Sequence, residues 1–125
     1  MILSIEELRD IYNSKVALEE AESLIELAEE KELYFTKNSE NTFPRVKEKR
    51  DQLQKKLLEM TPHMEETLEK ITNPRAYLIC CLHFRDGYSY ASIGRMLQAD
   101  QGVIRQSANW AIAQLQKKES EDFQK

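Results

Sequence analysis

The stretch from Asn73 to Lys118 constrains the fold most, because residues that start and stop helices divide it into short segments. Asn73 is a good N-cap, and Pro74 takes the first helical position, where its missing N–H costs nothing. Asp86-Gly87 ends this segment, since glycine readily adopts the left-handed conformation that terminates helices. We therefore expect a helix that starts at Pro74 and buries an apolar stripe of four residues, Tyr77, Leu78, Cys81 and Leu82.

Two more helices follow, separated by a short turn. Ser89 is placed to cap the first of them, whose inner face is Ile93 and Leu97. Gln98, Ala99 and Asp100 form the turn, and Asp100 caps a third helix over residues 101–117. One face of this third helix is apolar, with Ile104, Ala108, Ala111, Ile112 and Leu115. Two helices joined by so tight a turn predict a helix-turn-helix motif.

The same stretch carries a family resemblance. The residues concerned are Arg75, the run Asp86-Gly87-Tyr88-Ser89-Tyr90, Ile93, Leu97, Gly102, the run Val103-Ile104-Arg105, Ala111 and Leu115. Together they resemble the C-terminal, promoter-reading domain (region four) of bacterial sigma factors, and the small phage-encoded transcriptional regulators built on it. Gln98 stands where the family usually has a glycine, and Trp110 where a basic residue is common. The resemblance covers about a third of the chain and does not extend to residues 1–72.

The resemblance implies that helix 101–117 enters the major groove of double-stranded DNA. Arg105 would then pair bidentately with guanine, while Gln106 and Asn109 would read adenine edges. The helix start at Ser89, together with Arg95 and Lys117, would hold phosphates. The predicted DNA-binding residues are Ser89, Arg95, Gln101, Arg105, Gln106, Asn109 and Lys117. Trp110 is expected to lie away from the DNA, against the N-terminal residues or a partner, because a large indole is seldom left fully exposed.

The charge distribution also favours DNA binding. The whole chain has a formal net charge of −4. Residues 73–118 nevertheless hold six basic and two acidic residues, whereas residues 1–72 hold 11 basic and 17 acidic ones. Because phosphate contact requires only a local positive field, an acidic arm beside a basic domain is compatible with DNA binding.

The first 60 residues read as an antiparallel helical hairpin. Ser4 and Glu7 have capping-box spacing, and no Gly or Pro interrupts the chain from Ile5 to about Phe35. Residues 36–42 read as a polar loop, and Pro44 opens a basic second helix. The first helix carries a seam of alternating large and small residues, Ile11, Ser14, Leu18, Ala21, Ile25 and Ala28, and the second carries Val46, Leu53, Leu57 and Met60. Two such helices bury only one seam, so we expect the C-terminal domain or a second copy, in a homodimer, to complete it.

The remaining boundaries follow from Thr61-Pro62, where the residue before proline disfavours the helical conformation and a break or kink is expected. A new helix would start there with Met64, Leu68 and Ile71 as its buried stripe, and the sigma-like resemblance implies that it packs beneath the helix-turn-helix residues. Residues 119–125 are charged and are expected to be a frayed tail. The predicted fold is therefore all-α, with a hairpin over 1–60, a sigma-like DNA-binding domain over 61–118 and a tail over 119–125.

Catalytic, cofactor-binding and metal-binding patterns are absent from the sequence, so an enzyme is not expected. His63 and His83 lack partners at metal-ligand spacing and are interpreted as surface or capping residues. With three glycines there is no phosphate-binding loop, and no nucleophile elbow is present. Cys80 and Cys81 are interpreted as reduced, buried core residues, which favours a cytoplasmic protein. No apolar run is long enough to span a membrane.

Three functions are compatible with these patterns. The first is a sequence-specific DNA-binding transcriptional regulator, encoded by a phage or mobile element. The alternative is a protein-binding module that contacts RNA polymerase or another regulator through the sigma-like domain, which Trp110 and the acidic arm favour. The third is a DNA-packaging adaptor that oligomerises through its hairpin. Salt-dependent binding to a defined duplex separates the first from the second, and a ring-sized oligomer would favour the third.

Overall fold

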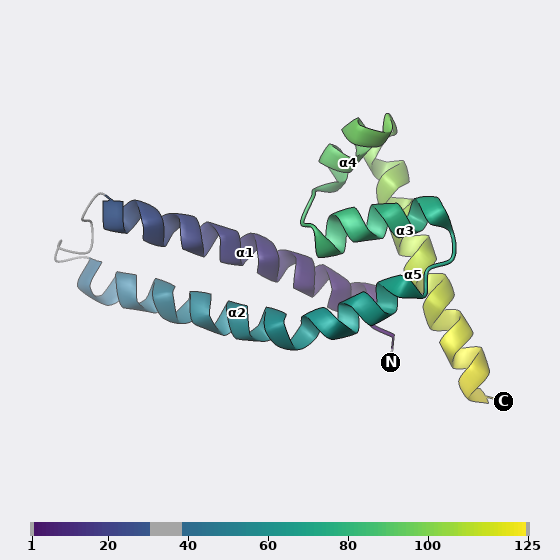
Figure 1. Cartoon of the computed structure of the whole chain (residues 1–125), viewed down its shortest axis with the longest axis horizontal. Coiled ribbons are helices and arrows are strands. Elements are labelled where there is room, and N and C mark those ends of the chain that lie inside the picture. The colour runs from purple at the N-terminus through teal and green to yellow at the C-terminus, as the bar shows by residue number, and fades with distance from the viewer. Residues whose placement is uncertain (1, 31–38, 125) are drawn as a thin grey trace. The chain divides into compact units, whose positions relative to one another are not determined.

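The chain is helical throughout the part that the structure describes. A computed structural model describes residues 2–30 and 39–124, with side chains for residues 2–30 and 44–121. These ranges form five α-helices, which Figure 1 labels, and one π-helical turn, with no strand. They are α1 (Ile5–Glu30), α2 (Ser39–Glu69), α3 (Pro74–Cys80), the π-helical turn η2 (Cys81–Arg85), α4 (Tyr90–Leu97) and α5 (Gln101–Gln124). The all-α prediction is confirmed.

Two compact units share these helices. Unit 1 comprises Met1–Tyr12 and Met60–Lys125, and unit 2 comprises Asn13–Glu59. The N-terminal residues up to Tyr12 therefore group with the residues from Met60 onward, whereas the domains expected from the sequence place residues 1–60 together. None of the helices over residues 5–30 and 39–124 has a segment both long enough and apolar enough to cross a bilayer.

Unit 1 has one apolar core, to which all its helices contribute. α5 packs against α3 and α4. The fully buried side chains come from both ends of the chain and include Leu3, Leu8, Ile11, Met64, Ile79, Phe84, Ile93, Ile104 and Ile112. Hydrogen bonds tie the first residues to this core. The Leu3 N–H donates to Thr67 Oγ1 at 3.0 Å, and Gln116 Nε2 donates to the Leu3 carbonyl at 2.8 Å.

The predicted helix starts are confirmed by side-chain caps. The Glu7 N–H donates to Ser4 Oγ, and the Ser4 N–H donates to Glu7 Oε1, both at 3.1 Å, which is a complete capping box. Asn73 Oδ1 accepts from the Ala76 N–H at 3.0 Å and caps α3. Each of these caps satisfies a backbone donor that has no partner within its own helix.

Side-chain caps also start α4 and α5, on either side of the turn between them. Ser89 Oγ accepts from the Ser92 N–H at 3.1 Å, and Asp100 Oδ2 accepts from the Gly102 N–H at 2.9 Å. Gln98 ends α4 in the left-handed conformation with φ 53°. A Cβ on Gly94 would lie 2.7 Å from the Ala99 carbonyl oxygen, so the turn requires a glycine at this position.

The stripe predicted for the helix after Asn73 is wrong in part. Tyr77 and Leu78 are exposed, at 39% and 45%, whereas Cys81 is buried and Leu82 is half-buried. The core-facing residues of α3 are Ala76, Ile79 and Cys80. The reason is that the helix continues into the π-helical turn η2, where the Asp86 N–H donates to the Cys81 carbonyl five residues back. Residues 83 and 84 thereby join the buried face.

α2 corrects two of the predicted boundaries. It starts at Ser39, so residues 39–42 are helical and not part of a loop; residues 36–38, like residues 31–35, lie outside the described part. Of the break or kink predicted at Thr61-Pro62, the break is wrong, because α2 continues through these residues to Glu69. Leu57, Met64 and Leu68 remain in phase on one buried face, and their packing favours a continuous helix despite the hydrogen bond that Pro62 cannot donate.

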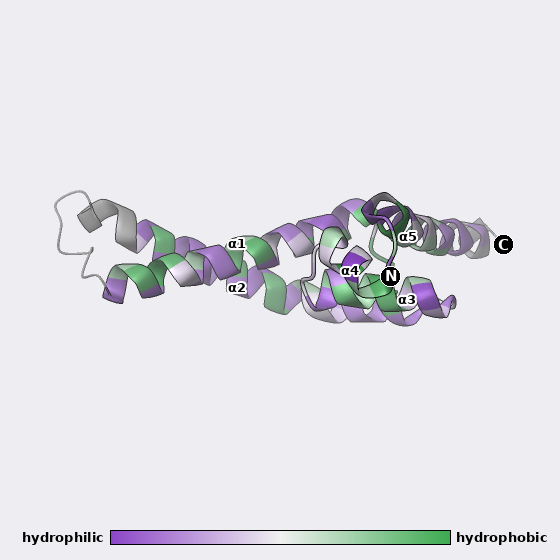
Figure 2. Ribbon diagram, turned by 90° about the horizontal axis from the view of Figure 1, so that it is seen from above, coloured by the Kyte–Doolittle hydropathy of each residue, from purple (hydrophilic) through white to green (hydrophobic). Residues whose placement is uncertain are grey.

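The predicted frayed tail is helical as far as Gln124. α5 passes without interruption through Lys118, since no Gly or Pro follows Gly102. Glu119 Oε2 accepts from the Ile2 N–H at 3.1 Å, which ties this segment to the start of the chain. Figure 2 shows that the last turns of α5 are mainly hydrophilic.

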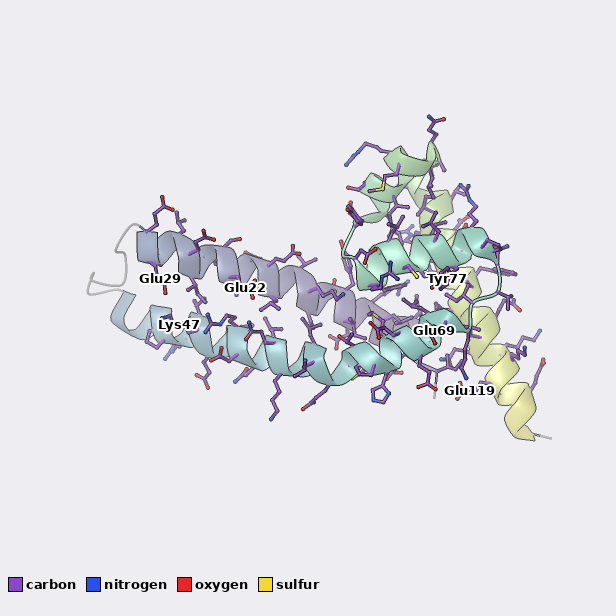
Figure 3. The ribbon with its side chains drawn as sticks, in the orientation of Figure 1. Glu22, Glu29, Lys47, Glu69, Tyr77 and Glu119 are labelled. Carbon is purple, nitrogen blue, oxygen red and sulfur yellow. The ribbon has the colours of Figure 1, made fainter. Side chains whose placement is uncertain are left out.

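Unit 2 contains the remainder of α1 and α2, joined by polar contacts. Lys47 Nζ lies 3.6 Å from Glu29 Oε1, and Gln54 Nε2 donates to Glu22 Oε1 at 3.3 Å. Figure 3 shows Glu29 and Lys47 pointing toward one another. The two pairs have the same residue-number sum, as expected for antiparallel helices. Among the residues of unit 2 whose side chains are described, few are buried: Ser14, Ala21, Ile25 and Leu57.

Candidate nucleic-acid interface

The exposed side of α5 carries three of the predicted base-reading residues in one stripe. Gln101 and Arg105 are exposed, and Asn109 is half-buried. A helix turns by about 100° per residue, so positions four apart differ by only about 40°. The structure therefore brings Gln101, Arg105 and Asn109 together.

Gln106 lies on a neighbouring face and has different neighbours. It lines a shallow groove with Trp110, Val103 and the start of α3, including Arg75. Trp110 is 57% exposed and Val103 is 50% exposed, so the indole is largely open to solvent within this chain. The prediction that Trp110 packs against a partner stays a prediction.

The predicted phosphate contacts on α4 form a connected network. Ser89 Oγ donates to Ser92 Oγ at 3.0 Å, and Arg95 Nη2 donates to the same Ser92 oxygen at 3.1 Å. The arginine is exposed and is held along the helix toward its N-terminal turn. This arrangement places a guanidinium group at the positive end of the α4 dipole, which suits an anion.

Lys117 lies apart from these residues. Twelve residues separate it from Arg105, which corresponds to about 18 Å along the helix axis. It lines a different groove, with Lys70, Lys118 and Glu121 among its neighbours. A contact from Lys117 would therefore reach a different part of a bound duplex.

Arg9 is a residue that the sequence reasoning missed. It is exposed on α1, and its Nη2 donates to Asn109 Oδ1 at 3.5 Å, across 100 positions of sequence. It is the only basic residue among the first 14, but nothing local in the sequence links it to α5. Neither Arg9 nor Arg105 forms an ion pair with a carboxylate among the residues whose side chains are described.

His83 corrects the prediction of a surface or capping histidine. It is 4% exposed and lies between two aromatic rings, with centroid distances of 3.9 Å to Tyr12 and 3.7 Å to Tyr90. The Tyr88 carbonyl lies 2.7 Å from Nδ1, and because a carbonyl only accepts, Nδ1 carries the proton. Burial lowers the pKa of His83, although the hydrogen bond to Tyr88 acts in the opposite direction. The imidazole is therefore held neutral.

The pKa of Tyr90 depends on its burial and on the charges around it. Burial raises the pKa of Tyr90 to about 12, and the thiol of Cys80 acts in the same direction. The positive charges of Arg9 and Arg105 oppose this rise. The Tyr90 hydroxyl is buried and has no hydrogen-bond partner among the described residues.

The two cysteines are buried, as predicted. Cys80 is 0% and Cys81 4% exposed, and both are free thiols. Burial raises the pKa of Cys80 to about 12, which keeps it protonated and a poor nucleophile.

Comparisons with known proteins assign no family to this arrangement. A scan against protein-family models, a search of curated proteins and a search of solved structures each gave no match.

Proposed function

We propose that this chain is a sequence-specific regulator of transcription that binds double-stranded DNA, with α4 and α5 acting as a helix-turn-helix. The observation that carries the proposal is the exposed stripe of Gln101, Arg105 and Asn109 on α5, next to a three-residue turn that Gln98 and Asp100 define. An arginine without a carboxylate partner, flanked by uncharged hydrogen-bonding side chains, suits base edges better than phosphates.

The sigma-like residues support the same proposal. They extend from Arg75 to Leu115 and include both helices and the turn between them. In this proposal α5 lies in the major groove, and Arg105 pairs with guanine. Ser89, Arg95 and Lys117 contact the phosphate backbone and position the protein without reading sequence.

Arg105→Ala tests the proposal once a target duplex has been isolated from fragments of the parent genome. We expect specific binding to weaken about tenfold or more, with relaxed preference at one base pair, because a bidentate contact to guanine contributes about 1 to 3 kcal/mol of discrimination. Lys117→Ala is the matched control, and it should weaken all sequences alike. Affinity measured for a panel of single-base variants of the duplex gives the result. If Arg105→Ala lowers affinity and leaves the sequence preference intact, Arg105 contacts a phosphate and the assignment is wrong.

A protein-binding role is the second candidate, and one observation favours it. The groove lined by Val103, Gln106 and Trp110 exposes apolar surface of a kind that partner proteins cover. In this case RNA polymerase or another regulator is the partner. Absence of salt-dependent binding to any duplex, together with retained binding to polymerase, would favour this role over the first.

A further inference from the structure

Arg9, in the second turn of α1, hydrogen-bonds one of the residues proposed to bind DNA. Leu8 and Ile11 face the core, at 0% and 1% exposed, so the intervening Arg9 is directed outward. Its guanidinium donates to Asn109, which lies one turn beyond Arg105 on α5. A residue from the start of the chain is thus adjacent to the exposed stripe of α5.

The aromatic stack fixes this adjacency. Tyr12 lies one turn after Arg9 on α1 and stacks on His83 of η2, whose other face stacks on Tyr90 of α4. Rings at these separations make favourable contacts, and the buried His83 ring between the two half-buried tyrosines limits sliding between the elements. Because Tyr12 is held in this way, the position of Arg9 relative to α4 and α5 is set by the core.

Arg9 and Arg105 place two positive charges on one side of unit 1. Arg9 contacts Asn109, which lies one helical turn from Arg105 on α5, and like charges gain nothing from such proximity. The neutral Asn109 side chain accepts one hydrogen bond from Arg9 at 3.5 Å. Most of the N–H donors of the Arg9 guanidinium group are therefore not used in this contact. A phosphate would supply both the charge and the acceptors that are missing.

We propose that Arg9 binds a phosphate of the DNA backbone beside the bases read from α5, which makes the start of α1 part of the DNA-binding surface. This inference rests on the proposed function. It assigns Arg9 a positioning contact and no part in sequence readout, since phosphate contacts fix register and carry no base information. The aromatic stack of Tyr12, His83 and Tyr90 sets where that contact falls.

The salt dependence of DNA binding tests the inference in the full-length chain. Each phosphate contact that is lost should reduce the slope of log affinity against log salt by about 0.9. We expect Arg9→Gln to reduce the slope by this amount, to weaken target and unrelated duplexes alike, and to leave the preferred sequence unchanged. Arg9→Lys, which keeps the point charge, should restore the slope.

Arg85→Gln is the matched control, because it removes the same charge from an exposed arginine that Asp86 already neutralises at 2.9 Å. Its slope should equal that of the wild type. If wild-type protein binds duplexes and Arg9→Gln leaves the slope unchanged, the inference is overturned while the proposed function stands. The inference is overturned in the same way if Arg9→Gln changes the slope no more than Arg85→Gln does. If wild-type protein shows no salt-dependent duplex binding, both are overturned.

Discussion

At the scale of single residues, His83 shows how a polar side chain can serve the core. Its ring is sandwiched by Tyr12 and Tyr90, its edge meets Phe84, and its Nδ1–H is satisfied by the Tyr88 carbonyl. The groups that face it are thus phenol and phenyl rings and a backbone carbonyl. Burial in these surroundings opposes protonation of the imidazole and lowers its pKa, although the hydrogen bond to Tyr88 acts in the opposite direction.

Acid should therefore destabilise unit 1 through His83. Its pKa in the folded chain is lowered by burial from the unfolded value of about 6.5, so below that pH the unfolded state binds more protons. The stabilising contribution is complete above about pH 6.5 and is lost as the pH falls through the lower, folded value. Urea unfolding between pH 7.5 and 5, followed by Trp110 fluorescence, measures this loss.

A matched pair of substitutions assigns the effect. His83→Phe keeps an aromatic ring in the stack and should flatten the pH dependence of the unfolding midpoint in this range. His63→Gln changes the other histidine, which is exposed, and should leave the dependence in place. Equal pH profiles for His83→Phe and wild type would show that His83 is not the titrating group.

At the scale of elements, the sequence predicts what local chemistry determines. The starts at Ser4, Asn73, Ser89 and Asp100 were predictable because each cap joins residues only two or three apart. The burial of His83 was not, since it involves stacking on Tyr12, 71 positions away in the chain. Arg9 was missed for the same reason: its link to Asn109 spans 100 positions.

Gly94 is the element-scale feature that a substitution tests most directly. We expect Gly94→Ala to destabilise unit 1 by about 1 to 3 kcal/mol, because the new methyl group would approach the backbone oxygen of Ala99 to 2.7 Å and force α4 and the turn apart. Thermal unfolding followed by circular dichroism measures the change.

Gly102→Ala is the comparison for this prediction. Its added Cβ would meet the end of the Asp100 side chain at 2.9 Å, which can rotate away. The replacement should therefore cost less, since alanine also favours the helix. Equal losses in the two variants would contradict the steric explanation.

At the scale of the whole molecule, the chain ends meet in unit 1. Leu3 is 0% exposed and is bonded through its backbone to Thr67 of α2 and Gln116 of α5. Unit 2, by contrast, leaves Val16, Leu24, Leu27 and Leu58 between 44% and 79% exposed. The N-terminal residues therefore stabilise the unit that carries the proposed DNA-binding surface.

Leucine-to-alanine substitutions compare the two environments. Leu3→Ala should lower the free energy of unfolding of unit 1 by about 2 to 5 kcal/mol, because it empties a fully buried site. Leu58→Ala, at a side chain that is 79% exposed, should change it by less than about 0.5 kcal/mol. Denaturant unfolding monitored by Trp110, the single tryptophan, reports on unit 1 alone. A Leu3→Ala variant as stable as Leu58→Ala would show that the N-terminal residues are dispensable for this core.

The π-helical turn at Cys81–Arg85 also determines how this segment tolerates changes in length. A hydrogen bond that closes over five residues holds one residue more than an α-helical turn would. Deleting one residue there would leave a regular helix, but everything after it would be rotated by about 100° relative to α3. The ring of His83 and the carbonyl of Tyr88 would then lose their alignment. The number of residues between Asn73 and Ser89 therefore cannot change without disturbing the core. The identity of an exposed side chain in this segment, such as Leu78, can change.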